Sequence, residues 1–300
     1  MKNLFARNPR RNKDQPNDPP PGQETPGGGA ESGSENPAPE IRLEPPQLLY
    51  GAGQSVGIER YENEDALFAT SLLLASGLRQ ERMGFFLVAD GMGGQQHGKE
   101  ASHAAARVMT GTVLGKITPG ILQSDPAQAA GSLQETLLEG IQEAQKAVLE
   151  AAPGGGTTLT AALVLGDNVT IGHVGDSRAY FYSREGEITR LTDDHTLVQR
   201  LQDLGQLTES ESREHPYRNV LYQALGQDEP LQPDIKTLHF KQPGALLLCS
   251  DGLWGVVSEK KLFGLIDWTR HPAEVCQEMV QMANEAGGPD NISVILVYLL

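Results

Sequence analysis

The chain has 300 residues, enough for one large domain with an ample hydrophobic core and a tail. Its net charge is −15, from 24 basic and 39 acidic residues, which argues against a nucleic acid as substrate, because nucleic-acid binding relies on a basic surface. An acidic body is compatible with a protein that concentrates divalent cations.

The first 45 residues are rich in Pro, Gly, Asn and Glu and hold almost no aliphatic side chains before Ile41. Such a segment cannot bury enough apolar surface to offset the entropy lost on ordering. We therefore predict a disordered tail at 1–45 and one folded domain at 46–300. A basic group in the tail could touch a membrane or a partner, although four charges in a polar tail are more often simply solvated. Its members are Arg7, Arg10, Arg11 and Lys13.

The start of the chain, MKNLFARNPRRNK, lacks the apolar core of a secretory signal peptide. Cys249 and Cys276 form no Cys-x-x-Cys pair and fall in apolar strand and helix patterns, which suits buried thiols in a reducing compartment. No apolar run reaches the roughly 20 residues that span a bilayer. We expect a soluble, cytoplasmic protein without a membrane span.

Apolar or β-branched runs bounded by turn residues predict strands in the folded domain. They cover 84–88, 158–165, 169–174, 179–182, 246–249 and 292–299. Gly166-Asp167-Asn168 predicts a tight hairpin, and Arg184-Glu185-Gly186 predicts a second one.

Helical patterns alternate with the strands in blocks. One covers 99–109, and Asp125-Pro126 predicts the start of a long helix with one apolar face. Others are predicted at 196–204, at 258–268 and from Pro272 to near Gly287. Strands linked by hairpins, with helices in pairs, indicate an α+β domain and not a parallel α/β fold.

Four aspartates stand where apolar strands end: Asp90, Asp176, Asp251 and Asp290. A buried strand end is a costly place for a carboxylate, and carboxylates gathered without basic partners repel one another unless a divalent cation binds them. Their hard oxygen atoms favour Mg²⁺ or Mn²⁺ over zinc. We therefore predict a multi-metal hydrolase that acts on a phosphate ester.

An ordinary turn is the competing interpretation, because the Asp-Gly pairs at 90–91 and 251–252 are common hairpin dipeptides. Both pairs lead into helical patterns, however, and not into an alternating strand. The signatures Cys-x5-Arg, Gly-Lys-Ser/Thr, His-Arg-Asp and Asp-Phe-Gly are missing from the sequence, which argues against cysteine phosphatases, P-loop enzymes and kinases. We expect His173 in the core or at its rim, whereas His195 is either an acid–base residue or an ordinary surface residue.

Eight motifs resemble, in their sequence, order and spacing, those of the metal-dependent protein phosphatases of type 2C, the PPM family, and in particular its compact bacterial members. They are GIERYENED (57–65), FFLVADGMGG (85–94), GGTTLTAAL (155–163), IGHVGDSRAYFY (171–182), LTDDHTLVQRL (191–201), HPYRNVLYQALG (215–226), LLLCSDGLWGVVS (246–258) and GGPDNISVILV (287–297). The resemblance implies a four-layer αββα sandwich, in which two antiparallel sheets are flanked by helix pairs. The segment 69–83 is longer than in the most compact relatives, and we predict an extended hairpin there.

The resemblance assigns most of the metal ligands. It implies that Asp90 bridges two metal ions at the catalytic centre, and that the carbonyl oxygen of Gly91 binds one of them. It also implies that Asp251 and Asp290 bind the first ion. Asp65, with Glu64 beside it, would serve the second ion, partly through water.

Two further roles follow from the same resemblance. Asp176 would join Asp251 at a third, weaker ion, as in bacterial relatives. Arg60 would hold the substrate phosphate, for which its planar fork is suited, although an ion pair with Glu59 or Glu62 is the simpler interpretation of that residue alone. Asn291 would either orient Asp290 or serve the turn.

These assignments imply hydrolysis of phosphoserine and phosphothreonine in proteins by a metal-activated water, with no covalent enzyme intermediate. The implied cofactors are two tightly held Mn²⁺ or Mg²⁺ ions and a weaker third, and the implied partners are phosphoproteins made by a Ser/Thr kinase. We expect a monomer. One alternative is an inactive phosphatase-fold module used for binding. The presence of a suitable residue at every expected ligand position argues against it. The other is a two-metal phosphodiesterase, against which the chain lacks a basic surface.

Overall fold

The computed structural model describes residues 47–76, 79–93, 95–123, 126–227, 230–240 and 243–300. The tail predicted at 1–45, with its basic group, lies outside these ranges. Within them no helix is long and apolar enough to cross a membrane.

The described strands form two five-stranded antiparallel sheets and one small two-stranded sheet. The first sheet has the order β1 (Leu48–Ser55), β12 (Ile292–Leu299), β11 (Gly244–Cys249), β8 (Arg178–Ser183) and β9 (Ile188–Arg190). The second has the order β10 (Asp234–His239), β7 (Asn168–Val174), β6 (Leu159–Leu165), β3 (Arg79–Ala89) and β2 (Ala66–Ser76). The small sheet pairs β4 (Gly91–Met92) with β5 (Gly156–Thr157).

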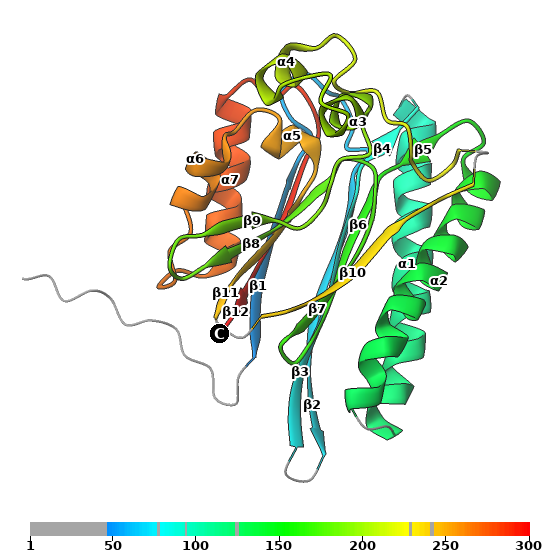
Figure 1. Cartoon of the computed structure of the whole chain (residues 1–300), viewed down its shortest axis with the longest axis vertical. Helices are drawn as coiled ribbons and strands as arrows, with labels where there is room; N and C mark the ends of the chain where they lie inside the picture. The colour runs from blue at the N-terminus through cyan, green and yellow to red at the C-terminus, as the bar shows by residue number, and fades with distance from the viewer. Residues whose placement is uncertain (1–46, 77–78, 94, 124–125, 228–229, 241–242) are drawn as a thin grey trace, which may run out of the picture. The chain divides into compact units, whose positions relative to one another are not determined.

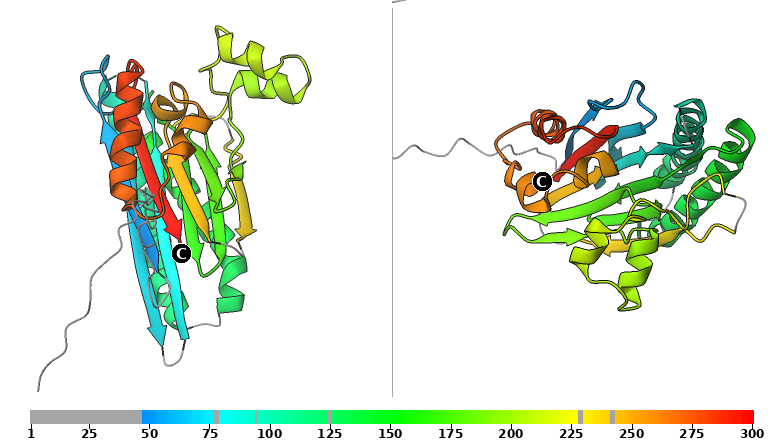
Figure 2. Two further views of the ribbon diagram at one scale, coloured as in Figure 1. Left: turned by 90° about the vertical axis from the view of Figure 1, so that its left-hand side faces the viewer. Right: turned by 90° about the horizontal axis from the view of Figure 1, so that it is seen from above.

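Helices cover the outer face of each large sheet (Figure 1). The long helices α1 (Gln95–Gln123) and α2 (Pro126–Ala151) pack on the second sheet. On the first sheet lie α5 (Asp251–Trp254), α6 (Glu259–Gly264) and α7 (Pro272–Glu285). The predicted four-layer αββα sandwich is therefore confirmed. Figure 2 shows α3 (Leu197–Asp203) and α4 (Glu209–Glu214) standing out from the sandwich at one end of its strands.

Alternation along the strands builds three hydrophobic clusters from two sheets. In β3, Phe86 and Val88 face the other sheet, whereas Phe85 and Leu87 face α1 and α2. Successive strand side chains point to opposite faces, so one apolar strand can serve two interfaces. Both cysteines are free and buried, as expected, and belong to the cluster beneath α5–α7.

Local turn signals located the hairpins well. The β6–β7 turn places Gly166 at φ 56°, and β8 pairs with β9 across the 184–186 turn. The extended hairpin is confirmed, because β2 and β3 pair without interruption from Ala66↔Ala89 to Ser76↔Arg79.

Two predicted helix boundaries were wrong. The helix predicted at 99–109 is α1, which runs to Gln123 because its later turns pack against α2 despite a weak apolar pattern. The helix predicted at 258–268 ends at Gly264. Beyond it the Asp267 carboxylate accepts hydrogen bonds from the backbone N–H and hydroxyl of Thr269, a local turn that competes with the helix. The edge strand β10 was not predicted.

Candidate metal centre

In the second sheet, strand register brings two of the predicted ligands together. Ala66 pairs with Ala89, so Asp65, just before β2, and Asp90, just after β3, are neighbours at the same end of the sandwich. Asp90 is fixed there through its backbone. Its N–H donates to the Thr158 hydroxyl (3.0 Å), and its carbonyl accepts from the Thr158 N–H and the Thr157 hydroxyl (both 2.9 Å).

In the first sheet, three more aspartates reach the same end. Cys249, near the end of β11, pairs with Arg178 of β8 and Val294 of β12. Asp251 follows β11 and begins α5, Asp176 precedes β8, and Asp290 precedes β12. Antiparallel pairing therefore places a strand end beside two strand beginnings.

The five aspartates interact electrostatically. Burial raises the pKa of Asp90 well above the ordinary carboxyl range, and the negative charges of Asp65, Asp251, Asp176 and Asp290 raise it further. Burial likewise raises the pKa of Asp176 and that of Asp251. Each carboxylate therefore makes ionisation of its neighbours harder.

Asp65 lies deepest in this cluster, with 4% of its surface exposed. Its Oδ2 atom accepts hydrogen bonds from the hydroxyls of Ser250 (3.0 Å) and Ser293 (2.7 Å). Its Oδ1 atom is buried and has no hydrogen-bond partner in the part of the chain that the structure describes. Burial raises the pKa of Asp65 to about 7, although the two serine hydrogen bonds act in the opposite direction.

Close backbone packing surrounds Gly91 and Glu64. A Cβ atom on Gly91 would lie 2.3 Å from the Gly98 carbonyl oxygen and 2.5 Å from that of Glu64, so only glycine fits. The Glu64 carboxylate reaches the same place, because a Cβ on Gly98 would meet its Oε2 atom at 2.1 Å. Burial raises the pKa of Glu64, and the Arg60 charge partly opposes this.

Asn291 fixes the loop that carries Arg60 and Glu64. Its amide Nδ2 donates to the carbonyl oxygens of Val56 (2.8 Å) and Glu62 (2.9 Å), and its Oδ1 accepts from the Glu64 N–H (2.8 Å). Its own N–H donates to Asp290 Oδ1 (2.8 Å). Both roles considered from sequence therefore apply, since this residue orients Asp290 and holds a loop from the opposite end of the chain.

Arg60 points toward the same cluster. Its Nη2 atom donates to Asp290 Oδ2 at 2.7 Å, with half of the arginine side chain exposed. The ion pair is therefore with a predicted metal ligand and not with Glu59 or Glu62.

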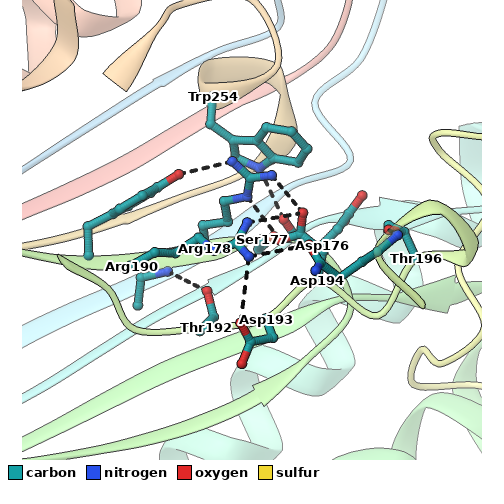
Figure 3. A network of polar contacts seen from close by, with 12 residues as sticks. Asp176, Ser177, Arg178, Arg190, Thr192, Asp193, Asp194, Thr196 and Trp254 are labelled. Atoms are coloured by element: carbon teal, nitrogen blue, oxygen red, sulfur yellow. Dashed lines mark hydrogen bonds and ion pairs between the residues drawn. The ribbon is translucent and has the colours of Figure 1, made fainter. Parts of the chain in front are cut away.

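Sequence reasoning missed a network behind Asp176 (Figure 3). Arg178 makes a two-pronged ion pair with Asp194, at 2.9 Å from Nε to Oδ1 and 2.6 Å from Nη2 to Oδ2. The same guanidinium lies over the Trp254 ring, whose Nε1–H donates to the Asp176 carbonyl oxygen (3.0 Å). The available signal was an arginine inside the apolar strand SRAYFY, followed by the acidic pair at 193–194.

His195 is not a surface residue, because only 4% of it is exposed. Its Nδ1 atom accepts from the Gly175 N–H (3.1 Å), and its Nε2 atom lies 3.3 Å from Asp234 Oδ2. His173, in the core as expected, packs against it with ring centroids 4.8 Å apart. The pair supports the turn that carries Asp176, and burial lowers the pKa of His173 to about 3.

The donor set fits divalent cations. Among the residues that the structure describes, no three His, Cys, Asp or Glu side chains already converge as ligands of one ion. The carboxylates are nevertheless neighbours, the other four raise the pKa of Asp90, and the buried Asp65 Oδ1 has no hydrogen-bond partner among the described residues. Hard oxygen donors with uncompensated negative charge suit Mg²⁺ or Mn²⁺.

Comparison with known proteins gives consistent matches. Residues 60–296 match the family model described as Protein phosphatase 2C. The serine/threonine protein phosphatase PstP of Mycobacterium tuberculosis is 33% identical over 257 residues, which cover 83% of this chain but only 44% of PstP. The serine/threonine phosphatase stp of Listeria welshimeri is 35% identical over 217 residues, which cover 70% of this chain and 82% of that protein.

A solved structure agrees in fold. The catalytic domain of the phosphatase PstP, in complex with two manganese ions, superposes with a TM-score of 0.67 at 30% identity. The superposition covers 84% of this chain and 99% of that domain.

Proposed function

The chain belongs to the protein phosphatase 2C family, and we propose that it is a Mg²⁺- or Mn²⁺-dependent protein serine/threonine phosphatase. The main support for this proposal is that five aspartates lie together at one end of the sandwich, with a buried oxygen on Asp65 that has no partner among the described residues. The reaction is hydrolysis: water supplies the oxygen that bonds to phosphorus, and the seryl or threonyl P–O bond breaks.

The first ion would be held by Asp90, Asp251 and Asp290, with the Gly91 carbonyl oxygen as a further ligand. The second would share Asp90 and be held by Asp65 and Glu64, partly through water. Asp176 and Asp251 would hold a weaker third ion. Ions bound at these positions supply Lewis acidity, which lowers the pKa of water and neutralises charge on the phosphate.

The protein's own groups orient the reactants. Ser250 and Ser293 fix one oxygen of Asp65 and leave the other available. Arg60 is the proposed phosphate-binding residue, because its exposed guanidinium already lies at the cluster and can present two N–H groups to a phosphate. Asn291 keeps Arg60, Glu64 and Asp290 in register.

The proposal extends to partners and setting. Its substrates are phosphoproteins made by a serine/threonine kinase, and it acts in the cytoplasm as a monomer. Two free, buried thiols suit a reducing compartment. All seven proposed ligand or phosphate-binding side chains and the Gly91 carbonyl come from one chain, which supports a monomer.

The test is turnover of a phosphothreonine peptide by the purified chain after EDTA dialysis, with and without added Mn²⁺ or Mg²⁺. We expect activity only with the added ion, and little activity on bis-p-nitrophenyl phosphate, a phosphodiester. Activity that survives EDTA would reject the metal-dependent mechanism. Phosphopeptide binding without turnover under every ion condition would favour an inactive binding module, and faster cleavage of the diester would favour a phosphodiesterase.

A further inference from the structure

An open groove of about 1050 Å³ lies beside the proposed metal centre. It is lined by Gln54 of β1, by Glu62 and Asp65 before β2, by the first two residues of β2, by residues of α1 between Lys99 and Arg107, and by the end of α2. Asp65 lines the groove and also belongs to the aspartate cluster, so the groove and the centre are continuous. A substrate segment bound at the centre can therefore extend into the groove.

The charge of the groove changes sign along its length. The acidic lining residues lie close in sequence to the proposed ligands Glu64 and Asp65 or in the first turns of α1. They are Glu62, Asp65 and Glu100. Lys99 is there too and pairs with Glu62 at 3.5 Å. The polar lining residues farther along α1 are His103 and Arg107, and neither has an ion pair among the described residues.

Three basic residues that line the groove form a row along α1. Lys99, His103 and Arg107 follow one another at intervals of four, which places them on one face of α1. Eight residues of helix cover about 12 Å, at 1.5 Å per residue. An extended peptide spans the same 12 Å with about four residues, at about 3.3 Å each.

We propose that this groove binds the acidic flank of the phosphoprotein substrate, with Arg107 contacting a carboxylate or second phosphate a few residues from the hydrolysed phosphoresidue. The inference rests on the proposed function and adds a substrate preference to it. Charge complementarity supports this inference. The chain has a net charge of −15, yet the exposed Arg107, which lines the groove beyond the segments at the metal centre, forms no ion pair with a described carboxylate. Arginine keeps its charge at every physiological pH and suits both carboxylate and phosphate.

The test compares kcat/KM for phosphothreonine peptides of equal length. One is neutral, and the others carry glutamates four residues before or four residues after the phosphothreonine. We expect the wild type to prefer one acidic peptide over the neutral one. In Arg107→Glu that ratio should fall roughly three- to tenfold, the scale of an exposed charge pair, and the loss should be in KM. The wild-type preference should also shrink between about 20 mM and 300 mM salt, as screening increases.

A matched control is Lys260→Glu in α6, which makes the same charge change at an exposed site outside the groove. It should leave the peptide ratio unaltered. Equal effects of the two variants, or a wild type without preference for either acidic peptide, would overturn the inference while p-nitrophenyl phosphate is still hydrolysed with Mn²⁺. Absence of that hydrolysis in the wild type would overturn the proposed function, and this inference with it.

Discussion

The guanidinium carbon of Arg178 lies 3.5 Å from the centre of the Trp254 ring, and the two side chains connect Asp194 to the backbone of Asp176. Trp254 is the last residue of α5, the short helix that begins with Asp251. Two proposed ligands from different parts of the chain are thus held by one buried ion pair and one indole hydrogen bond. Neither Arg178 nor Trp254 needs to touch the substrate to affect catalysis.

Arg178→Gln should lower the free energy of unfolding by about 3 kcal/mol, because the Asp194 carboxylate, only 6% exposed, loses both close hydrogen bonds and keeps only the Arg190 guanidinium, 3.8 Å away. The measurement is denaturant unfolding of the metal-free protein. Arg270→Gln is the matched control, since Arg270 makes a similar two-pronged pair with Glu278 at the surface, and should cost no more than about 1 kcal/mol. Equal losses in both variants would contradict the role of burial.

Trp254→Phe should keep most of the ring stacking and remove the hydrogen bond to the Asp176 carbonyl oxygen. We expect a stability loss of about 1 kcal/mol, the net value of one hydrogen bond. Turnover should fall more than this loss of stability explains, because the turn carrying Asp176 loses its tie to α5. Unchanged kcat with a lowered melting temperature would show that the contact serves only the fold.

Asp90→Asn and Asp251→Asn should each reduce turnover by at least about 100-fold, on the scale of losing a group that positions a catalytic ion. Neither should destabilise the metal-free protein at pH 8, because each removes one of several mutually repelling carboxylates. Turnover, ion stoichiometry and melting temperature should be measured together, with the exposed Asp203→Asn as control. Wild-type turnover with full ion binding would remove these residues from the centre.

Proton binding and ion binding should compete at Asp65. Its folded-state pKa, about 7, lies above the unfolded value of about 3.9, so its contribution to metal-free stability is complete below pH 4 and is lost as the pH rises through 7. Added Mn²⁺ requires the deprotonated carboxylates and should therefore raise the melting temperature more at pH 8 than at pH 5.5. Thermal scans in EDTA and in Mn²⁺ at both pH values measure this. An equal or larger shift at pH 5.5 would be the opposite result.

His173 should make the protein acid-sensitive in the other direction. Its folded pKa, about 3, lies below the unfolded value of about 6.5, so the stabilising contribution of the neutral ring is present above pH 6.5 and lost as the pH falls toward 3. Between pH 7 and pH 5 the wild type should lose about 2 kcal/mol relative to His173→Gln, whose amide does not titrate. Parallel stability curves for the two proteins would show that His173 is readily protonated in the folded state.

Sequence patterns were sufficient for features that neighbouring residues determine. Gly166-Asp167 marked the β6–β7 hairpin, Pro272 marked the start of α7, and the aspartates at 90, 176 and 251 marked strand ends, whereas Asp290 stands before a strand and not after one. These signals are local, because turn conformation, helix capping and side-chain alternation depend on a few adjacent positions. The overlong helix predicted after Ser258 shows the limit, since a single Asp267–Thr269 turn was enough to end it early.

Only the tertiary structure decided which of these residues meet. Asp65 hydrogen-bonds to Ser250 and Ser293, which lie 185 and 228 positions away, and Asn291 holds a loop more than 220 positions before it. Such contacts follow from which strands pair and in what register, and a shift by one residue would turn every side chain to the other face. The sequence by itself thus determined that carboxylates flank apolar strands. The arrangement of two antiparallel sheets decided that five of them lie together at one end of the sandwich, and that Arg178 and Trp254 hold the backbone near Asp176 and Asp251 in place.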